Sequence, residues 1–258
     1  MAAMSSSMSS LDSAHSRSRA LSRIHAKFPQ YAVSVDVRRR PFSFVGDKKG
    51  VSKSTQSWHD ALLGYVGGDE TTRNNAEASM LRLAQKAGTT LDYQVETQWQ
   101  PVEAQRALLW ASRFGLGEEF VNALNVRHFT QRKSAVHRST ILEAAEEASL
   151  DVNALVTFLD TDELADVVWK SYGDTIKKHG IHAIPWLYFN NDGPSLTSDG
   201  GPYGGGARHE GELHQGSGPV DTFYALFLRL MERETKGEVR WHPSMAHGDD
   251  GDGGACML

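Results

Sequence analysis

The stretch "GDTIKKHGIHAIPWLYFN", residues 173–190, decides the fold of this chain. Its first half is typical of a helix C-terminus, because lysines and His179 precede Gly180. Its second half contains Trp186–Phe189, an apolar and aromatic segment typical of a buried strand. Pro185 lies between them, and a residue without an N–H can begin a strand but cannot donate to its ladder. The stretch therefore predicts a helix, a short loop and a strand that starts at the proline.

The composition is that of an ordinary soluble globular protein, with 258 residues of which 40% are hydrophobic and 23% charged. A net charge of −5 argues against a general nucleic-acid binder, which is usually basic. No apolar run approaches the roughly 20 residues of a membrane span, and residues 1–27 lack the apolar block of a secretory signal. We therefore expect a cytoplasmic protein with no nucleic-acid or membrane partner. The Ser- and Arg-rich start leaves an organelle transit signal as the alternative.

The chain has a single cysteine, Cys256. A lone thiol can form neither an internal disulfide framework nor a CxxC redox pair. Only Met257 and Leu258 follow it, whereas the prenylation motif needs three residues. Cys256 is therefore interpreted as a solvated cysteine in the tail of the chain.

Three segments are too rich in Gly, Ser, Pro and Asp to bury much apolar surface: residues 1–10, 190–215 and 236–258. We expect the first to be a disordered leader and the last a disordered tail. The middle segment is expected to be a long flexible loop between two strands.

The rest of the chain shows clear periodicity. Residues 11–27 predict an amphipathic helix, and the alternating, β-branched stretch at 31–38 predicts a strand. A mostly polar, glycine-containing stretch follows residue 46. Six further helices are predicted at residues 74–88, 101–115, 117–131, 137–150, 151–160 and 161–180, and the strand at 186–189 is followed by a short strand near Leu213 and a helix at 219–234. The order is α–β, a block of helices, then β–β–α.

The Ile184–Pro185 bond joins the last helix of the block to a buried strand. Bonds of this type adopt the cis form at modest cost, although the local sequence alone favours trans. A cis bond at this junction would turn the backbone and leave an amide and a carbonyl at a free edge. Such an edge can pair with an extended peptide.

Together these segments resemble the DsbA-like thioredoxin-fold family, in the branch of FrnE-type oxidoreductases and 2-hydroxychromene-2-carboxylate isomerases. The most specific similarity is "HGIHAIPWLYF", in which Pro185 occupies the place of the family's cis-proline. "VDVRRRPFSFV" is similar to the family's second strand, and "EAQRALLWASRFG" and "GSGPVDTFYALFLRL" are similar to its helices. The resemblance covers about residues 11–235 apart from the Gly-rich loop. It implies a cis Ile184–Pro185 bond.

The fold class implied by the resemblance is α/β, a thioredoxin-like fold with an inserted all-helical domain and without its first strand. The units it implies are a leader (1–10), the first part of the thioredoxin-like domain (11–46), the helical insertion (47–172), the second part of the thioredoxin-like domain with its loop at 190–215 (173–235) and a tail (236–258).

The departure from the family lies at its active site. Family members begin with a hydrophobic strand and then CxxC, or a serine-containing equivalent, at the start of the first helix, where the pKa of the first thiol is lowered. If that helix maps to residues 11–27, the motif would fall near Ser7–Ser10, and only "MAAMSS" precedes it. A catalytic Ser7 or Ser9 is the alternative to a disordered leader, and the leader is favoured.

The resemblance implies a member of the thiol–disulfide oxidoreductase family that is redox-inactive over these 258 residues, because CxxC is absent. The alternatives are a non-catalytic module that binds peptide or protein at the cis-proline edge, and a glutathione-dependent isomerase or transferase. Ile184, Pro185 and His182 are the substrate-binding candidates, and no catalytic residue is assigned. The expected partner is a polypeptide or a glutathione-like thiol. Glutathione is the one cofactor considered, and a homodimer is among the expected assemblies.

The missing first strand has a structural consequence. In a thioredoxin-type sheet it lies between the strands expected at 31–38 and 186–189, so two inner edges lose their ladder partners. Buried unpaired N–H and C=O groups cost about 1–3 kcal/mol each. The two strands could pair directly, another molecule could supply a strand, or a strand could be encoded upstream of Met1. The third arrangement is favoured.

The remaining polar and aromatic clusters do not predict sites. "HEGELH", residues 209–214, is not an HExxH motif and lies in the Gly-rich loop. "DDGDGG" lacks the other ligands of a calcium loop, so no metal ion is expected. Arg38–Arg40 are interpreted as solvated, and Trp110, Phe158 and Trp169 as core residues.

Overall fold

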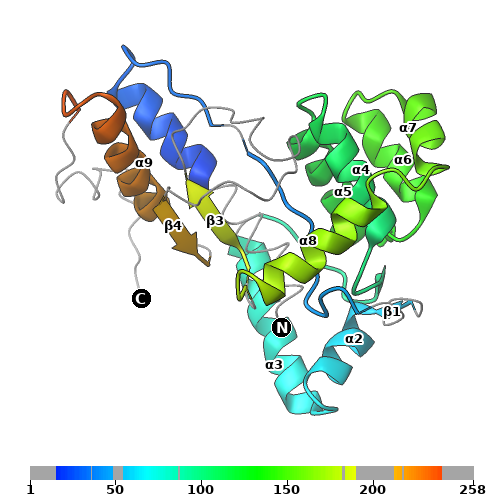
Figure 1. Ribbon diagram of the computed structural model, residues 1–258. Helices are drawn as coiled ribbons and strands as arrows, with labels where there is room; N and C mark the ends of the chain where they lie inside the picture. Colours follow the sequence, from blue (N-terminus) through cyan, green and yellow to red (C-terminus); the bar gives the residue numbers. More distant parts are fainter. Residues whose placement is uncertain are drawn as a thin grey trace.

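The computed structural model describes residues 16–35, 37–48, 55–86, 88–181, 184–189, 212–216 and 218–239. Figure 1 shows the chain in two parts. One part contains the helix of residues 16–27, a β-hairpin and the last helix, α9 (Val220–Glu234). The other part contains the remaining helices.

The smaller part has one apolar core between the two ends of the chain. Its hairpin pairs β3 (Trp186–Phe189) with β4 (Glu212–Gln215) in antiparallel orientation. Ile24, on the helix of residues 16–27, and Phe223, on α9, belong to this core and are fully buried. Residues 16–27 therefore form an integral layer of the folded unit, and a cleaved transit segment that included them would open this core.

The strand predicted at residues 31–38 is wrong. In the structure residue 31 is a bend, and residues 32–35 and 37–38 belong to neither a helix nor a strand. Val33 donates its N–H to the carbonyl of Tyr31 at 3.0 Å, and its own carbonyl lies 2.6 Å from His25 Nε2. These local bonds occupy the N–H and carbonyl of Val33 and the carbonyl of Tyr31, while the side chains of both residues pack on the core of the smaller part.

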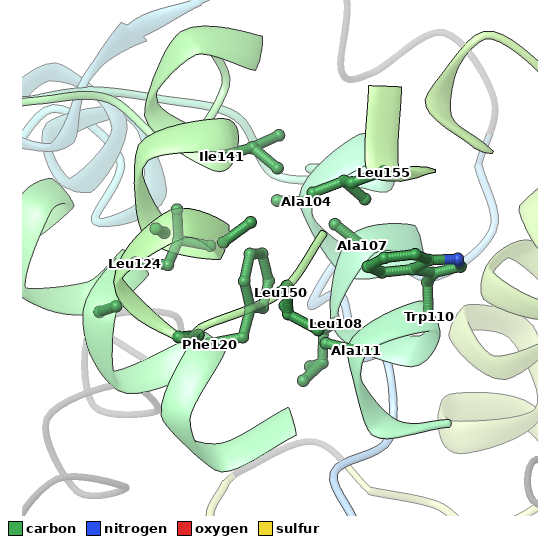
Figure 2. Packing of buried hydrophobic residues seen from close by; sticks show 14 of the residues in the cluster. Ala104, Ala107, Leu108, Trp110, Ala111, Phe120, Leu124, Ile141, Leu150 and Leu155 are labelled. Atoms are coloured by element: carbon green, nitrogen blue, oxygen red, sulfur yellow. The ribbon is translucent and has the colours of Figure 1, made fainter. Parts of the chain in front are cut away.

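Four predicted helices form a bundle in the larger part. A continuous apolar core joins them, and its tight packing around Phe120 is seen in Figure 2. The fully buried members include Ala107, Ile141 and Leu155. The helices are α4 (Val102–Ser112), α5 (Gly117–Thr130), α6 (Arg138–Glu147) and α7 (Val152–Leu159).

Helix α8 (Ala165–Lys177) packs on α4 and leads toward the hairpin. It begins four residues later than predicted, because Leu164 has a left-handed backbone with φ of 65° that interrupts the helix. It then crosses the expected boundary between residues 172 and 173 without a break. The helix is followed by Gly180 with φ of 61°, a conformation that glycine adopts at low cost.

The sequence analysis missed a helix and short strands in and after the polar, glycine-containing stretch that follows residue 46. Helix α2 begins after Ser57, whose side chain accepts a hydrogen bond from the N–H of Asp60 at 3.0 Å. Trp58 on this helix is buried in a core of its own. The N-capping serine was the available signal. The missed or extended elements are β1 (Gln56–Ser57), α2 (Trp58–Tyr65), α3 (Glu70–Lys86) and β2 (Glu96–Thr97).

The expected loop and tail are only partly described. Residues 190–211 lie outside the described ranges, but Glu212–Gln215, counted in the loop, form β4. Val239, counted in the tail, is 4% exposed and belongs to the core of the smaller part. Among the described helices, none has the length and apolar character to span a bilayer.

Candidate substrate-binding edge at Pro185

Pro185 lies where the chain enters the hairpin, as the sequence predicted. It is buried, and its peptide bond with the half-buried Ile184 is cis. The carbonyl of Pro185 accepts a hydrogen bond from Gly216 N at 2.9 Å. The third predicted binding residue, His182, lies outside the described residues, so the structure brings two of the three candidates together.

The register of the hairpin determines which backbone groups face away from β4. Pro185 and Gly216 form a hydrogen-bonded pair, and such pairs alternate with non-bonded pairs along an antiparallel ladder. Leu187 therefore bonds to β4, whereas the backbone groups of Trp186 and Tyr188 are directed toward the opposite edge of β3. In the described part of the chain, this sheet contains β3 and β4 alone.

One face of the hairpin is held against α9. The ring of Phe189 lies 5.9 Å from that of Phe227, and the imidazole of His214 lies 5.1 Å from the ring of Phe223. Successive side chains alternate between faces, so Leu213 points to the other face, where it is 49% exposed. The described residues thus leave an apolar side chain of β4 accessible to solvent.

Glu212 forms ion pairs with two arginines of α9. Its carboxylate accepts from Nη2 of Arg229 at 2.6 Å and from Nη2 of Arg233 at 2.7 Å. Because two guanidinium groups already neutralise this carboxylate, Glu212 is poorly suited to bind a metal ion. The other acidic residue of "HEGELH", Glu210, lies outside the described residues. No group of three His, Cys, Asp or Glu side chains within the described ranges is placed to hold a metal ion.

The described residues of the edge offer recognition groups and no nucleophile. Ser7, Ser9 and Cys256 lie outside the described residues, which contain no thiol. What the described groups supply is backbone hydrogen bonding along β3 and apolar surface from the hairpin. This chemistry can bind an extended chain and cannot by itself exchange a disulfide.

Sequence reasoning missed a polar cavity of about 460 Å³ between β2 and the start of α6. Two cationic side chains and one imidazole line it, and each is already paired with a carboxylate, so the cavity carries no excess positive charge. No linear motif marked these residues, since they come from separate segments. The pairs are Arg132–Asp92 at 2.6 Å, Lys133–Glu143 at 2.5 Å and His137–Glu96 at 2.8 Å.

Comparison with known proteins identifies the architecture. Residues 14–202 match the family described as the DSBA-like thioredoxin domain. The chain is also similar to the crystal structure of a probable DsbA oxidoreductase from Streptomyces coelicolor, with a TM-score of 0.62 and 15% sequence identity over 90% of this chain and 88% of that chain. No curated protein matches the chain. The fold is thus a DsbA-like thioredoxin fold with a largely helical insertion, the fold class that the sequence predicted.

Proposed function

The chain belongs to the DSBA-like thioredoxin-domain family, and from this premise we propose that residues 1–258 act as a redox-inactive module that binds extended polypeptide. The single cysteine carries the proposal, because dithiol–disulfide exchange needs a second thiol to resolve the mixed disulfide. Membership of the FrnE-type and isomerase branch is part of this proposal and rests on the stretch around Pro185.

The binding site proposed is the edge of β3 that faces away from β4, with Ile184 and Pro185 at its beginning; His182, outside the described residues, stays a candidate from the sequence alone. Three features support it. The alternation of the ladder directs the backbone of Tyr188 to this edge. The described part of the sheet has no further strand there. A polypeptide that adds a strand gains main-chain hydrogen bonds without needing catalytic groups.

An insulin-reduction assay tests the redox half of the proposal. Purified 1–258 protein should show no turnover above that of dithiothreitol alone, because Cys256 has no partner thiol in the chain. Turnover that persists in the Cys256→Ser variant would show that other groups perform the chemistry and would overturn redox inactivity.

Two matched proline variants test the binding half. Tyr188→Pro removes an N–H directed to the proposed edge, whereas Leu213→Pro removes one directed to the outer edge of β4. With fluorescently labelled, reduced and alkylated insulin B chain as the probe, we expect Tyr188→Pro to weaken binding at least tenfold and Leu213→Pro to change it little. Circular dichroism would verify that both variants fold. Equal affinities for the two folded variants would rule out the β3 edge.

A further inference from the structure

We propose that the segment of residues 41–48, here called the strap, acts together with Gly173 of α8 to position the entry to the binding edge at β3. The inference rests on the proposed function, because it concerns how Ile184 and Pro185 are held in place. Gly173 and Asp47 are the positioning residues, and they act on the edge through α8.

Helix α8 links the bundle to the binding edge, as Figure 1 shows. In its first half, Val168 is fully buried in one cluster with Leu109 of α4. Beyond its other end, the N–H of the buried Ile181 donates to the carbonyl of Thr175 at 3.0 Å. Pro185 follows only four residues later. A shift of α8 is therefore transmitted to the backbone that enters β3.

One side of the strap is bonded to the bundle. Gln105 of α4 pairs with the backbone of Phe42, since its Oε1 accepts from the N–H at 3.1 Å and its Nε2 donates to the carbonyl at 3.1 Å. Just before α4, Nε2 of the buried Gln100 donates to the carbonyl of Gly46 at 2.6 Å. These side-chain amides bond the strap backbone much as a neighbouring strand would, so the strap is fixed to the bundle at two points.

The other side of the strap lies on α8. Ser171 Oγ donates to the carbonyl of Pro41 at 2.7 Å, and Lys177 Nζ donates to Oδ2 of Asp47 at 2.7 Å. Between these two bonds Gly173 is buried, and a Cβ at this position would lie 2.8 Å from Oδ2 and 3.1 Å from Cγ of Asp47. Glycine is less favourable than alanine inside a helix, so the close approach of the strap gives a physical reason for this glycine.

The strap thus holds α8 against α4 through contacts that lie outside the binding edge. The exposed ion pair of Lys177 with Asp47 contributes little by itself, so the backbone bonds and the close packing at Gly173 carry the effect. A larger side chain at residue 173 would displace Asp47 and the strap, and α8 would lose this support. The carbonyl of Pro185 would then move relative to the N–H of Gly216, which it accepts at 2.9 Å.

Two matched leucine variants of the full chain test the proposal. Gly173→Leu places a side chain against the strap, whereas Gly64→Leu places the same side chain on α2, where a Cβ would meet no atom within 4 Å. Both changes favour the helix itself. We expect Gly173→Leu to speed amide exchange at Gly216 roughly tenfold and to weaken binding of labelled, reduced and alkylated insulin B chain about fivefold, with protection in α5 and α6 retained. Gly64→Leu should change neither quantity.

A milder variant serves if the leucine at residue 173 prevents folding. Ser171→Ala removes the donor to the carbonyl of Pro41 and should produce the same two changes at about twofold. Its control, Ser112→Ala, loses a hydroxyl bond within α4 and should produce neither.

The two measurements separate this inference from the proposed function. Exchange at Gly216 needs no ligand, so a wild type that fails to bind the B chain would overturn the proposed function alone. Unchanged exchange at Gly216 in both folded strap variants would overturn the positioning role. A uniform loss of protection along the chain would do the same, because it would reduce Gly173 and the strap to a contribution to overall stability.

Discussion

His128 is a buried imidazole that joins three segments of the larger part. Trp58 Nε1 lies 3.0 Å from its Nε2, and the N–H of Ala135 lies 3.1 Å from its Nδ1. A neutral ring accepts one of these bonds at a time, and a protonated ring accepts neither. Burial lowers the pKa of His128 to about 4, so the ring is neutral at physiological pH.

This buried histidine predicts acid sensitivity. Between pH 6.5 and 4 the unfolded chain binds a proton at His128 that the folded chain does not, so the free energy of unfolding falls as the pH falls. The contribution reaches about 3 kcal/mol near pH 4. We expect His128→Gln to be less stable than wild type at pH 7, with the difference shrinking toward pH 4.5 in urea denaturation. Parallel stability curves for the two proteins would contradict this prediction.

Removing the hydroxyl of Tyr172 is expected not to destabilise the protein. Its side chain is fully buried, and its hydroxyl has no hydrogen-bond partner in the described structure. Tyr172→Phe should therefore leave the free energy of unfolding unchanged or raise it by about 1 kcal/mol. The control is Tyr93→Phe, which loses a bond to the carbonyl of Glu77 at 3.4 Å and should destabilise. A loss above about 1 kcal/mol for Tyr172→Phe would indicate a partner that this account lacks.

At the scale of elements, Arg106 fixes the connection between α7 and α8 to α4. Its guanidinium donates to the carbonyls of Glu163 at 2.7 Å, Thr161 at 2.5 Å and Phe158 at 3.3 Å. The residue is 6% exposed. Thr161 and Glu163 lie in the connection and Phe158 in the last turn of α7, so the arginine supplies donors to carbonyls that a continuing helix would otherwise bond.

We expect Arg106→Met to lower the free energy of unfolding by about 3–5 kcal/mol, because three carbonyls around this buried guanidinium lose a charged donor. Arg113→Met is the control. That arginine pairs with the partly exposed carboxylate of Glu163 at 2.6 Å, and its loss should cost less than about 1 kcal/mol. Chemical denaturation measures both changes. A similar cost for the two variants would show that the buried carbonyls are satisfied in another way.

At the scale of the whole molecule, the apolar core of the smaller part is separate from that of the helical bundle, which favours two cooperative units. Phe223 belongs to the core of the smaller part, and Leu155 to that of the helical bundle. The segment of residues 37–48, which follows the smaller part along the chain, is held to the bundle by polar contacts such as the ion pair of Arg39 with Glu118. Polar contacts at a junction transmit less stabilisation than a shared apolar core does.

Hydrogen exchange should therefore resolve the two units. Phe223→Ala and Leu155→Ala each remove a fully buried side chain, at an expected cost of about 2–5 kcal/mol. We expect each variant to lower amide protection in its own unit and to leave the other nearly unchanged. A uniform fall of protection along the chain, in either variant, would show that the molecule unfolds as one unit.

The elements that the sequence predicted well are those whose signals are local. Apolar periodicity located the bundle helices and α9 within a few residues, and Pro185 together with the aromatic stretch located β3. The cis isomer of the Ile184–Pro185 bond was expected from the family resemblance and not from local rules. By locating β3, the sequence also placed two of the three candidate binding residues, Ile184 and Pro185, where the chain enters this strand.

Only the tertiary structure decided what depends on a distant partner. Residues 31–38 have the pattern of a strand, yet a strand exists only where a neighbour offers a ladder, and this segment bonds locally instead. The arginines of the first helix look alike in sequence, but folding brings Asp221 to Arg23 across 198 positions. The sequence alone gives the charge of a side chain. Whether an opposite charge or a hydrogen-bond partner balances it depends on which groups the fold places within a few ångströms.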